Sequence, residues 1–318
     1  MVLLQQKRQP RLKGAAESID DGSVSGDIWA FLFERTHKQK FTQEETLQPY
    51  RSFLICATPF DGSVLLCEAL KSTGIAGWPE EYFGVFDQAV PRGYRENIAP
   101  TGHQDSPSGY WNEAGYANSL ANTFRRGTSP NGVFGAKVLW SYFDQFVCSL
   151  RQIPMYRDMP VFDLLPTAFP NLQYVWFIGG DKVHQAISLW KAAQMHIWGF
   201  THAPERQFVF NYEAVDRFAR HIVAHEMEWL RFFNACDIQP FIVGYEDLLS
   251  DYEGTMHRLL KYLQLSPSER MTFTRPPLER QTDAVVELWC KRYYQIKQRY
   301  SFDSLPAYSQ REDNTFDL

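Results

Sequence analysis

Two short turns in this chain each connect an apolar run to a helix-like run, an arrangement that many proteins use to hold a phosphate. The first turn, TPFDGS at 58–63, lies between the runs FLICA and SVLLCEALKST. The backbone amides of Gly62, Ser63 and Val64 would open the second run as a helix, whose dipole favours negative charge. The Walker pattern GxxxxGK and the dinucleotide pattern GxGxxG are both absent, so neither an ATPase nor a Rossmann site is supported. The first turn therefore predicts an anion cradle that is built from backbone amides.

The second turn, Gly179-Gly180-Asp181, repeats this arrangement further along the chain. It follows the apolar run LQYVWFI and precedes KVHQAISLWKAAQM. Asp181 is placed to cap the helix, because a carboxylate there accepts hydrogen bonds from amides of the first helical turn. Lys182 and His184 lie on that first helical turn and could bring positive charge to a phosphate. The sequence thus offers a second candidate anion site.

Glu80 and Glu81, in GWPEEYF, follow the first predicted helix and are candidates for proton transfer. A carboxylate in a partly closed site can take the proton from a hydroxyl as that hydroxyl attacks. An adjacent pair of glutamates after Pro79 is also typical of a solvated turn. Both interpretations stay open on these residues alone.

From residue 50 onward the chain alternates between strand-like and helix-like patterns. This alternation predicts an α/β fold with a mainly parallel sheet that is flanked by helices on both faces. Ligands in such sheets bind at the carboxyl ends of the strands, so we expect the two turns to lie side by side. The segment 84–130 is rich in Gly, Pro, Asn and Tyr and is predicted to form long loops or a substrate lid. The expected strands are 51–57, 131–140 and 172–178, and the expected helices are 63–73, 143–150, 182–198 and 211–234. The stretch 239–265 is expected to supply a further strand and a helix with Tyr252, Met256, Leu259, Leu260 and Leu263 on one face.

The composition is typical of a large globular domain. The chain has 318 residues, of which 44% are hydrophobic, and its formal net charge is −5. This charge gives no sign of nucleic acid or of a membrane surface as a partner. No apolar run approaches the roughly 18 to 20 residues of a membrane span. The N-terminus has too short an apolar run for a secretory signal, so we expect a soluble, cytoplasmic protein.

The cysteines and histidines predict neither a disulfide framework nor a metal centre. The five cysteines are widely spaced without a CxxC pair, and we expect them to be reduced and mostly buried. His221 and His225 have i, i+4 spacing on a predicted helix, but no third ligand is evident in the sequence. We therefore expect no metal.

Several further stretches occur in an order that resembles bacterial sulfotransferases. After the first turn come GIAGWPEEYF, NGVFGAKVLW, the second turn, VGYEDLLSDYEGTMHRLLKYLQL and PPLERQTD. Over about residues 50–303 this pattern resembles the trehalose 2-sulfotransferase family. The AGxPxEYF, NGVxGxK and LERQxD matches are fairly specific, whereas YEDLL is common to sulfotransferases more broadly. The resemblance implies a P-loop-like sulfotransferase fold.

The resemblance also implies a reaction and the residues that perform it. The donor would be 3′-phosphoadenylyl sulfate (PAPS), the acceptor a hydroxyl of a sugar or small natural product, and the second product PAP. The first turn, with Gly62, Ser63 and Val64, would hold the 5′-phosphosulfate, and the second turn the 3′-phosphate. Glu81 falls on the position of the general base. The resemblance further implies a homodimer.

The chain departs from the family pattern at the donor site. Phe60 and Asp61 stand where the family usually has a Lys or Arg followed by Ser. Gly179 and His184 stand where it has Arg and Ser. Loss of two cationic partners would weaken donor binding by about 3 to 6 kcal/mol, since each charged hydrogen bond contributes roughly 1.5 to 3 kcal/mol.

Two interpretations of this degenerate donor-binding loop follow. In the first, cations from elsewhere replace the missing ones and the protein remains a sulfotransferase; the candidates are Lys137, Lys182, His184 and Arg280. In the second, PAPS use has been lost, and the fold performs a different transfer or lyase chemistry or acts as a non-catalytic binding protein. The pattern over the whole chain favours the first.

The domain organisation that follows has three parts. Residues 1–48 are predicted to be an N-terminal extension, 49–303 the sulfotransferase-like domain and 304–318 a C-terminal tail.

Overall fold

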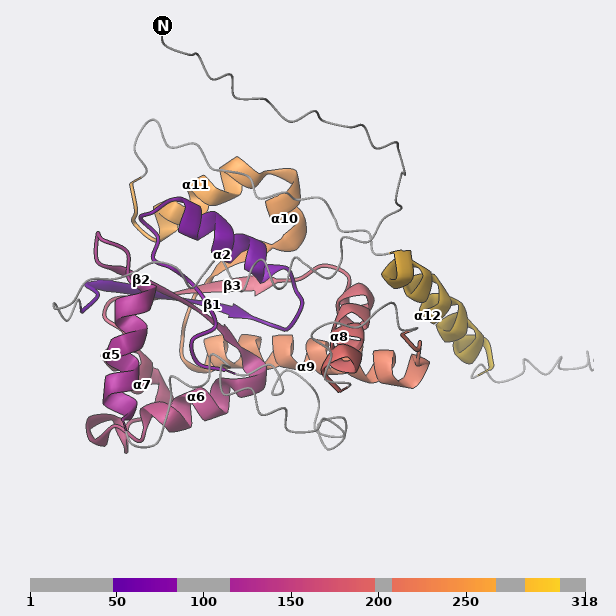
Figure 1. Ribbon diagram of the computed structural model, residues 1–318, viewed down its shortest axis with the longest axis horizontal. Helices are drawn as coiled ribbons and strands as arrows, with labels where there is room; N and C mark the ends of the chain where they lie inside the picture. Colours follow the sequence, from indigo (N-terminus) through magenta and orange to yellow (C-terminus); the bar gives the residue numbers. More distant parts are fainter. Residues whose placement is uncertain (1–47, 85–114, 198–207, 267–283, 304–318) are drawn as a thin grey trace, which may run out of the picture. The chain divides into compact units, whose positions relative to one another are not determined.

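The sheet at the centre of the fold is parallel. The computed structural model describes residues 48–84, 115–197, 208–266 and 284–303. In these residues four strands pair in the order β2-β1-β3-β4, and each pairing is parallel (Figure 1). The strands are β1 (Arg51–Ala57), β2 (Val133–Leu139), β3 (Leu172–Ile178) and β4 (Phe241–Gly244). The predicted parallel α/β architecture is confirmed.

Strands β1 and β2 are buried along almost their whole length. This burial explains their continuous apolar sequences, because both faces of a parallel sheet are covered by helices. Ala57 is the register partner of Leu139, and Cys56 is the register partner of Trp176. The carboxyl ends of β1, β2 and β3 therefore meet at one edge of the sheet.

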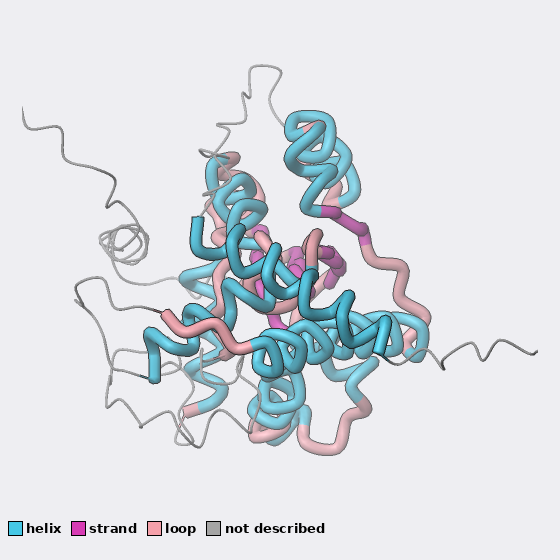
Figure 2. The backbone as a smooth tube through the Cα atoms, turned by 90° about the vertical axis from the view of Figure 1, so that its right-hand side faces the viewer, coloured by secondary structure: helices cyan, strands magenta, loops and turns pink. Residues whose placement is uncertain are grey.

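Helices cover both faces of the sheet. Figure 1 shows α2, α10 and α11 on one side of the strands and α5, α6, α7 and α9 on the other, and in Figure 2 the strands are enclosed by helices. The bounds on the first side are α2 (Ser63–Ser72), α10 (Tyr245–Ser250) and α11 (Tyr252–Tyr262). On the second side they are α5 (Tyr116–Gly127), α6 (Phe143–Leu150), α7 (Val161–Ala168) and α9 (Tyr212–Ala235), with the short 3-10 helices η2 (Trp140–Tyr142) and η3 (Pro154–Tyr156) between β2 and α7.

A second apolar cluster joins α8 (Lys182–Ile197), α9 and α12 (Ala284–Asp303). Ile187 of α8, Phe218 of α9 and Tyr293 of α12 are fully buried in it. Val183, Ala186 and Ala193 of α8 are also buried there, at helical spacing, with Trp190 partly buried at their side. Phe60 of the first turn also packs against this cluster. The first turn is thus fixed to the helix that follows the second turn.

Helix α5 corrects the prediction of long loops over 84–130. Leu120 and Phe124 lie one helical turn apart and are both buried, whereas most other side chains of α5 are polar. The Asn and Gly residues of this segment have low helix propensity, so the packing of this one face stabilises the helix. Residues 85–114, where the rest of the predicted lid falls, lie outside the described residues.

The helix expected within 239–265 is α11, and its predicted apolar face from Tyr252 to Leu263 is buried. The short helix α10 before it was not expected; Asp251 separates the two and caps α11 through the amide of Gly254. Helices α7 and α12 were not predicted. The tail at 304–318 and nearly all of the extension at 1–48 lie outside the described residues, so the proposed domain boundaries stay a prediction.

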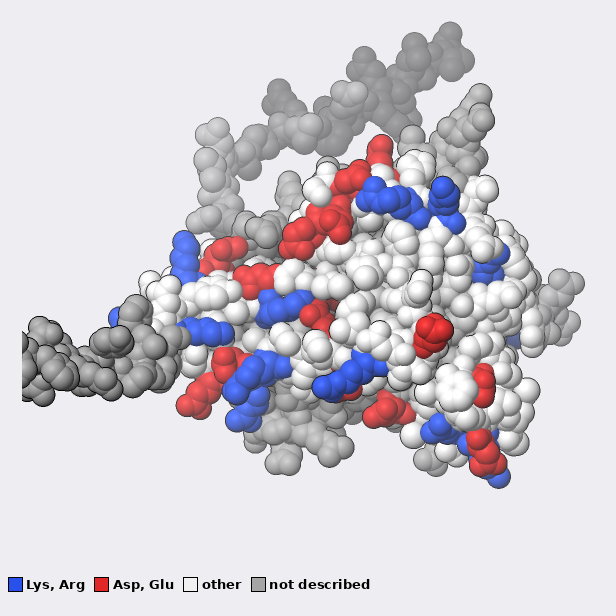
Figure 3. Space-filling model, turned by 180° about the vertical axis from the view of Figure 1, so that it is seen from behind, with Lys and Arg blue, Asp and Glu red and all other residues white. Residues whose placement is uncertain are grey.

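Charges of both signs are interspersed on the face of the described residues that Figure 3 shows. None of the described helices is both long and apolar enough to cross a bilayer.

Candidate active site

The two turns lie against each other at the carboxyl edge of the sheet. A Cβ placed on Gly179 would be 2.8 Å from Cβ of Asp61 and 2.9 Å from its Cα. Gln185 of α8 links the turns, since its Nε2 donates to Oγ1 of Thr58 at 2.8 Å and to the carbonyl of Pro59 at 2.5 Å. The predicted juxtaposition of the two turns is confirmed.

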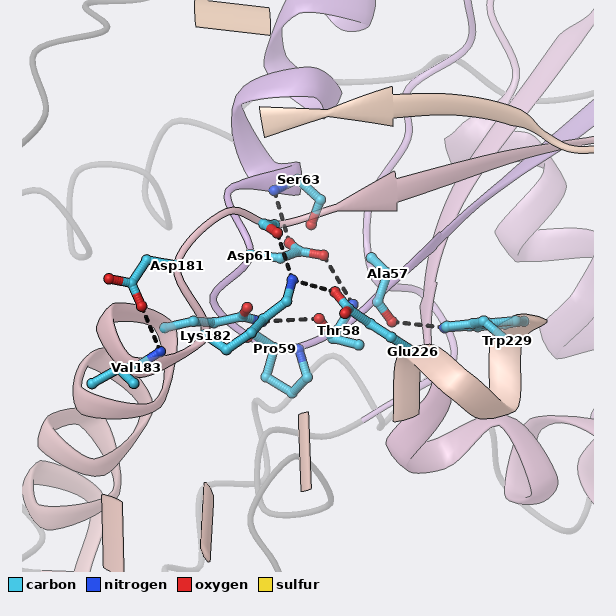
Figure 4. A network of polar contacts seen from close by, with 12 residues as sticks. Ala57, Thr58, Pro59, Asp61, Ser63, Asp181, Lys182, Val183, Glu226 and Trp229 are labelled. Carbon is cyan, nitrogen blue, oxygen red and sulfur yellow. Dashed lines mark hydrogen bonds and ion pairs between the residues drawn. The ribbon is translucent and has the colours of Figure 1, made fainter. Parts of the chain in front are cut away.

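Asp61 folds back into the first turn and occupies its amides (Figure 4). Its Oδ2 accepts from the amide of Thr58, and its Oδ1 accepts from the amide of Ser63, both at 2.9 Å. The side chain is only 5% exposed. The carboxylate therefore takes hydrogen-bond donors that an anionic ligand of this turn would use.

Burial raises the pKa of Asp61 above its ordinary value, because a low-dielectric site disfavours the charged form. The hydrogen bonds from Ser63 and Thr58 and the positive charge of Lys137 act in the opposite direction and offset part of this rise. Asp61 is thus a buried carboxyl group whose charge is balanced by backbone amides and by one lysine.

Two residues of the first turn, Gly62 and Phe60, are each explained at their positions by a different structural reason. Gly62 has a φ of 95°, and a Cβ there would lie 2.6 Å from the ring of Tyr245 in α10, so only glycine fits. Phe60 has a φ of 58°, which is unusual for a residue other than glycine. Its packing against the α8–α9–α12 cluster accounts for an apolar residue where the family pattern has a cation.

Glu81 forms an ion pair with Lys137 of β2. The distance from Glu81 Oε1 to Lys137 Nζ is 2.6 Å, and the two side chains are 35% and 8% exposed. Burial alone would lower the pKa of Lys137, but the negative charge of Glu81, with a smaller contribution from Asp61, raises it above its ordinary value. Lys137 therefore stays positively charged, close to both the candidate base and the first turn.

Glu80 faces a different lysine. Its Oε1 accepts from Lys71 Nζ at 2.9 Å, and Lys71 also pairs with Glu68 at 2.9 Å. The carbonyl of Glu80 accepts from the amide of Lys137 at 2.9 Å, so the glutamate segment is bound to the edge of β2. Successive residues of an extended segment point to opposite sides, which explains why the two glutamates have different partners.

The second turn carries an aspartate and a lysine that is paired with a glutamate (Figure 4). Oδ1 of Asp181 accepts from the amides of Val183 at 2.8 Å and His184 at 3.2 Å, which confirms the predicted cap. Lys182 Nζ pairs with Glu226 of α9 at 2.5 Å and donates to the carbonyl of Gly179.

For the remaining predicted site residues, the structure describes fewer contacts. His184 is partly buried, and Val64 lies on α2 directly after Ser63. Arg280 lies outside the described residues. A Cβ on Gly180 would strike the carboxylate of Glu246, which adds a further acid from α10 to the second turn.

Sequence reasoning missed Lys71, Gln185 and Glu226 as members of this region. Gln185 follows Asp181 by one helical turn, which was a usable signal for a side chain facing the first turn. Lys71 and Glu226 had no such signal, because their partners come from other elements.

The cysteines agree with the expectation of reduced and mostly buried thiols. All five are free, and Cys56, Cys67 and Cys290 are buried. Burial raises the pKa of Cys67 to about 12, so it stays protonated beside Lys137. No group of three potential metal-binding side chains occurs among the residues that the structure describes.

A model of the Stf0 sulphotransferase family matches residues 52–295, from β1 into α12. The chain belongs to this family. Membership confirms the resemblance found in the sequence and assigns the chain to the sulfotransferases, a class of enzymes that transfer a sulfuryl group.

Curated relatives are similar over almost their full length. The trehalose 2-sulfotransferase of Mycolicibacterium smegmatis (strain ATCC 700084 / mc(2)155) is 27% identical over 276 residues, covering 80% of this chain and 97% of that protein. The trehalose 2-sulfotransferase of Mycobacterium tuberculosis (strain ATCC 35801 / TMC 107 / Erdman) is 26% identical over 263 residues, covering 76% and 94%.

Solved sulfotransferase domains are more distant. The domain from the curacin biosynthetic pathway aligns with a TM-score of 0.38 and 14% identity, covering 69% of this chain and 75% of that one. The domain from the Synechococcus PCC 7002 olefin synthase has a TM-score of 0.30 and 14% identity, covering 84% and 100%. Both TM-scores are low, so the architecture rests on the sheet and helices of this chain.

Proposed function

We propose that this sulfotransferase moves the sulfuryl group of PAPS to a hydroxyl of a sugar or small natural product, with Glu81 as the general base. The observation that carries the proposal is the ion pair between Glu81 and Lys137 at 2.6 Å. It joins a partly exposed carboxylate to a buried cation whose charge also acts on the first turn. Family membership supplies the class of reaction.

The reaction requires a base and a way to balance negative charge. PAPS supplies an activated sulfuryl group and yields PAP. A bond forms between the acceptor oxygen and sulfur while the bond from sulfur to the phosphate oxygen breaks. The acceptor's proton passes to the carboxylate of Glu81, which its partial exposure leaves accessible to an acceptor.

Lys137 has two tasks in this proposal. Its ammonium group orients Glu81, and its backbone amide is bound to Glu80, so the lysine cannot move far. A fixed cation in a buried site stabilises negative charge that develops on reacting oxygens, without the cost of reorganisation. Lys137 thereby takes the place of the cation that Phe60 and Asp61 do not provide.

The residues present fit the 5′ end of the donor better than its 3′-phosphate. The first helical turn of α2 begins at Ser63 and has amides without intrahelical partners, which suit a phosphosulfate once Asp61 gives up the amide of Ser63. Gly62, Ser63 and Val64 would hold that group. Lys182, His184 and Arg280 are the proposed contacts of the 3′-phosphate, although Lys182 must first leave Glu226.

One observation favours the second candidate function, in which PAPS is no longer used. Asp61 and Asp181 accept hydrogen bonds at the N-termini of both helices, α2 and α8. Both candidate anion sites thus already hold a carboxylate from the chain itself. In that case the protein performs a different transfer or lyase reaction or binds a ligand without catalysis.

The names of the curated relatives support a sugar as the acceptor, and trehalose is the first acceptor to test. Cytoplasmic location and a homodimer remain predictions from the sequence.

The proposed function is tested with PAPS that carries a labelled sulfuryl group and with trehalose and other hydroxyl compounds as acceptors. We expect labelled ester and PAP to form in equal amounts. Glu81→Gln should lower turnover by about 100-fold or more, the usual effect of losing a general base. Glu80→Gln is the matched control, since Glu80 pairs with Lys71 instead, and it should retain most activity. Equal turnover by Glu81→Gln and wild type would contradict the role of Glu81, and absence of transfer with PAP release by hydrolysis alone would contradict the acceptor class.

A further inference from the structure

We propose that Asp61 is a built-in competitor of the sulfuryl donor, and that donor binding is coupled to the uptake of one proton by Asp61. Its carboxylate occupies the amide of Ser63, one of the amides that the donor's phosphosulfate would use. This inference rests on the proposed function, because it concerns the same donor at the same turn.

The geometry sets the two anions in competition for one amide. Each oxygen of the Asp61 carboxylate is bound to a different amide of the turn, one on Thr58 and one on Ser63. The amide of Ser63 has one hydrogen, so a phosphate that binds it must displace or share the hydrogen bond to Asp61. Gly179 packs on the backbone of Asp61 from the other turn, which prevents the loop from simply shifting away.

Gln185 provides an independent observation that the region between the turns is short of hydrogen-bond donors. This residue is 3% exposed, and its Oε1 has no hydrogen-bond partner among the described residues. That oxygen lies 3.0 Å from the same Cβ position on Gly179 that is 2.8 Å from Cβ of Asp61. Gly179 therefore borders both Asp61 and a buried acceptor without a partner, and such an acceptor costs free energy. The turn thus has no spare hydrogen-bond donor there for a second anion. A proton on Asp61 would remove its charge and weaken its hold on the Ser63 amide.

The surrounding charges favour this uptake once a donor anion arrives. Lys137 of β2 is the cation that acts on Asp61, and it is already paired with Glu81. Cys67 of α2 is protonated, Tyr245 of α10 borders Gly62 and Glu246 of α10 borders Gly180. Lys182 of α8 and Glu226 of α9 form an ion pair, so together they add no net charge. A second anion beside a charged Asp61 would thus meet mostly acidic or neutral groups, so protonation removes the repulsion. Burial already raises the pKa of Asp61, which is consistent with this.

The test is calorimetric titration of PAP into the intact protein and into Asp61→Asn, at about pH 6 and about pH 8, in buffers of different ionisation enthalpy. At the higher pH the variant should bind PAP about tenfold more tightly or better, because its amide carries no charge to compete. The wild type should take up about one more proton per PAP than the variant, and its affinity should fall more steeply as pH rises. PAP itself titrates, but equally in both experiments.

Two further variants keep the result interpretable. Asp61→Ser removes the carboxylate with a smaller side chain and should show the same gain in affinity, which guards against poor folding of Asp61→Asn. Asp251→Asn is the matched control, because Asp251 caps α11 through Gly254 but is exposed and outside the site. It should bind PAP as the wild type does.

The outcomes separate this inference from the proposed function. If the wild type binds PAP and the Asp61 variants show the same affinity or the same proton uptake, the competition is refuted while the donor stands. If neither the wild type nor either Asp61 variant binds PAP, the donor assignment and the inference both fail.

Discussion

The turn after β1 and the turn after β3 each place an aspartate at the N-terminus of a helix, but the two aspartates have different surroundings. Asp61 is buried between Gly179 and the start of α2, with Lys137 as its cation. Asp181 is exposed and accepts from two amides of α8, with the hydroxyl of Tyr294 3.3 Å from its Oδ1.

This difference shows that similar capping chemistry can have different consequences. An exposed carboxylate can exchange its amide contacts for water at little cost, so its role is limited to capping the helix. A buried carboxylate cannot reach water, so anything that displaces it must also deal with its charge. We therefore expect perturbations at the first turn to change function and those at the second turn to change mainly affinity or stability.

The largest effect should come from Lys137 of β2, the cation that acts on the first turn. Lys137→Met should lower turnover by about 100-fold or more, since it removes a fixed charge from the reacting groups. Lys71→Met is the control, because Lys71 pairs with Glu80 and Glu68 and not with Glu81. Turnover with labelled PAPS is the measurement, together with thermal unfolding to confirm that both variants fold. Similar losses in the two variants would place the reacting groups elsewhere.

Contact between the turns should be sensitive to a single methyl group. Gly179→Ala should destabilise the protein by about 1 to 3 kcal/mol, because the added Cβ overlaps the backbone of Asp61. Gly179→Arg should cost at least as much, so restoring the family's arginine alone should not restore a donor site. Chemical denaturation measures both. A Gly179→Ala variant as stable as wild type would mean that the turns are less tightly packed in solution.

The lysine of the second turn should affect the 3′-phosphate alone. Lys182→Ala should weaken PAP binding by about 1.5 to 3 kcal/mol and leave AMP binding unchanged, since only PAP has the phosphate in question. Glu226→Gln should have the opposite effect on PAP, because it releases Lys182 from its ion pair. Calorimetry with both nucleotides tests this. If neither variant changes the preference for PAP over AMP, the second turn does not hold the 3′-phosphate.

The exposed cap should have a modest effect. Asp181→Ala should lower stability by about 1 kcal/mol, the usual cost of losing an N-cap. It should leave proton uptake on PAP binding unchanged, in contrast to Asp61→Asn. A change in proton uptake in Asp181→Ala would mean that the two turns do not differ in the way their burial implies.

The smallest effects concern the pH dependence of stability, and they should have opposite signs at two aspartates. The folded pKa of Asp61 is raised by burial, so its contribution to stability is present below its ordinary value of 3.8 and is lost as pH rises through the folded value. The pKa of Asp251 is lowered, first by the hydrogen bond from Arg258, so its contribution is present above 3.8 and is lost as pH falls. Denaturation of wild type, Asp61→Asn and Asp251→Asn across the acidic range measures each difference. Parallel curves for wild type and Asp61→Asn would contradict the raised pKa.

The sequence by itself determined the parallel sheet, the two turns and the family. Strands such as RSFLICA and LQYVWFI are read from local composition, and helix α8 from its apolar spacing and the cap at Asp181. These signals are local, because backbone hydrogen bonding and side-chain periodicity act over a few residues. The position of both turns at one sheet edge then follows from parallel topology. Helix α5 is not predictable from the sequence, because its helix propensity is low and it is stabilised by the packing of one face.

Only the tertiary structure decided which charges meet. The sequence placed Asp61 where the family has a serine, but it could not show that the carboxylate turns inward to the amides of its own loop. Nor could it show that Glu81 pairs with Lys137 while Glu80 pairs with Lys71, or that Lys182 is held by Glu226. Ion pairs of this kind join separate elements, and their strength depends on distance and burial, which exist only once the chain has folded.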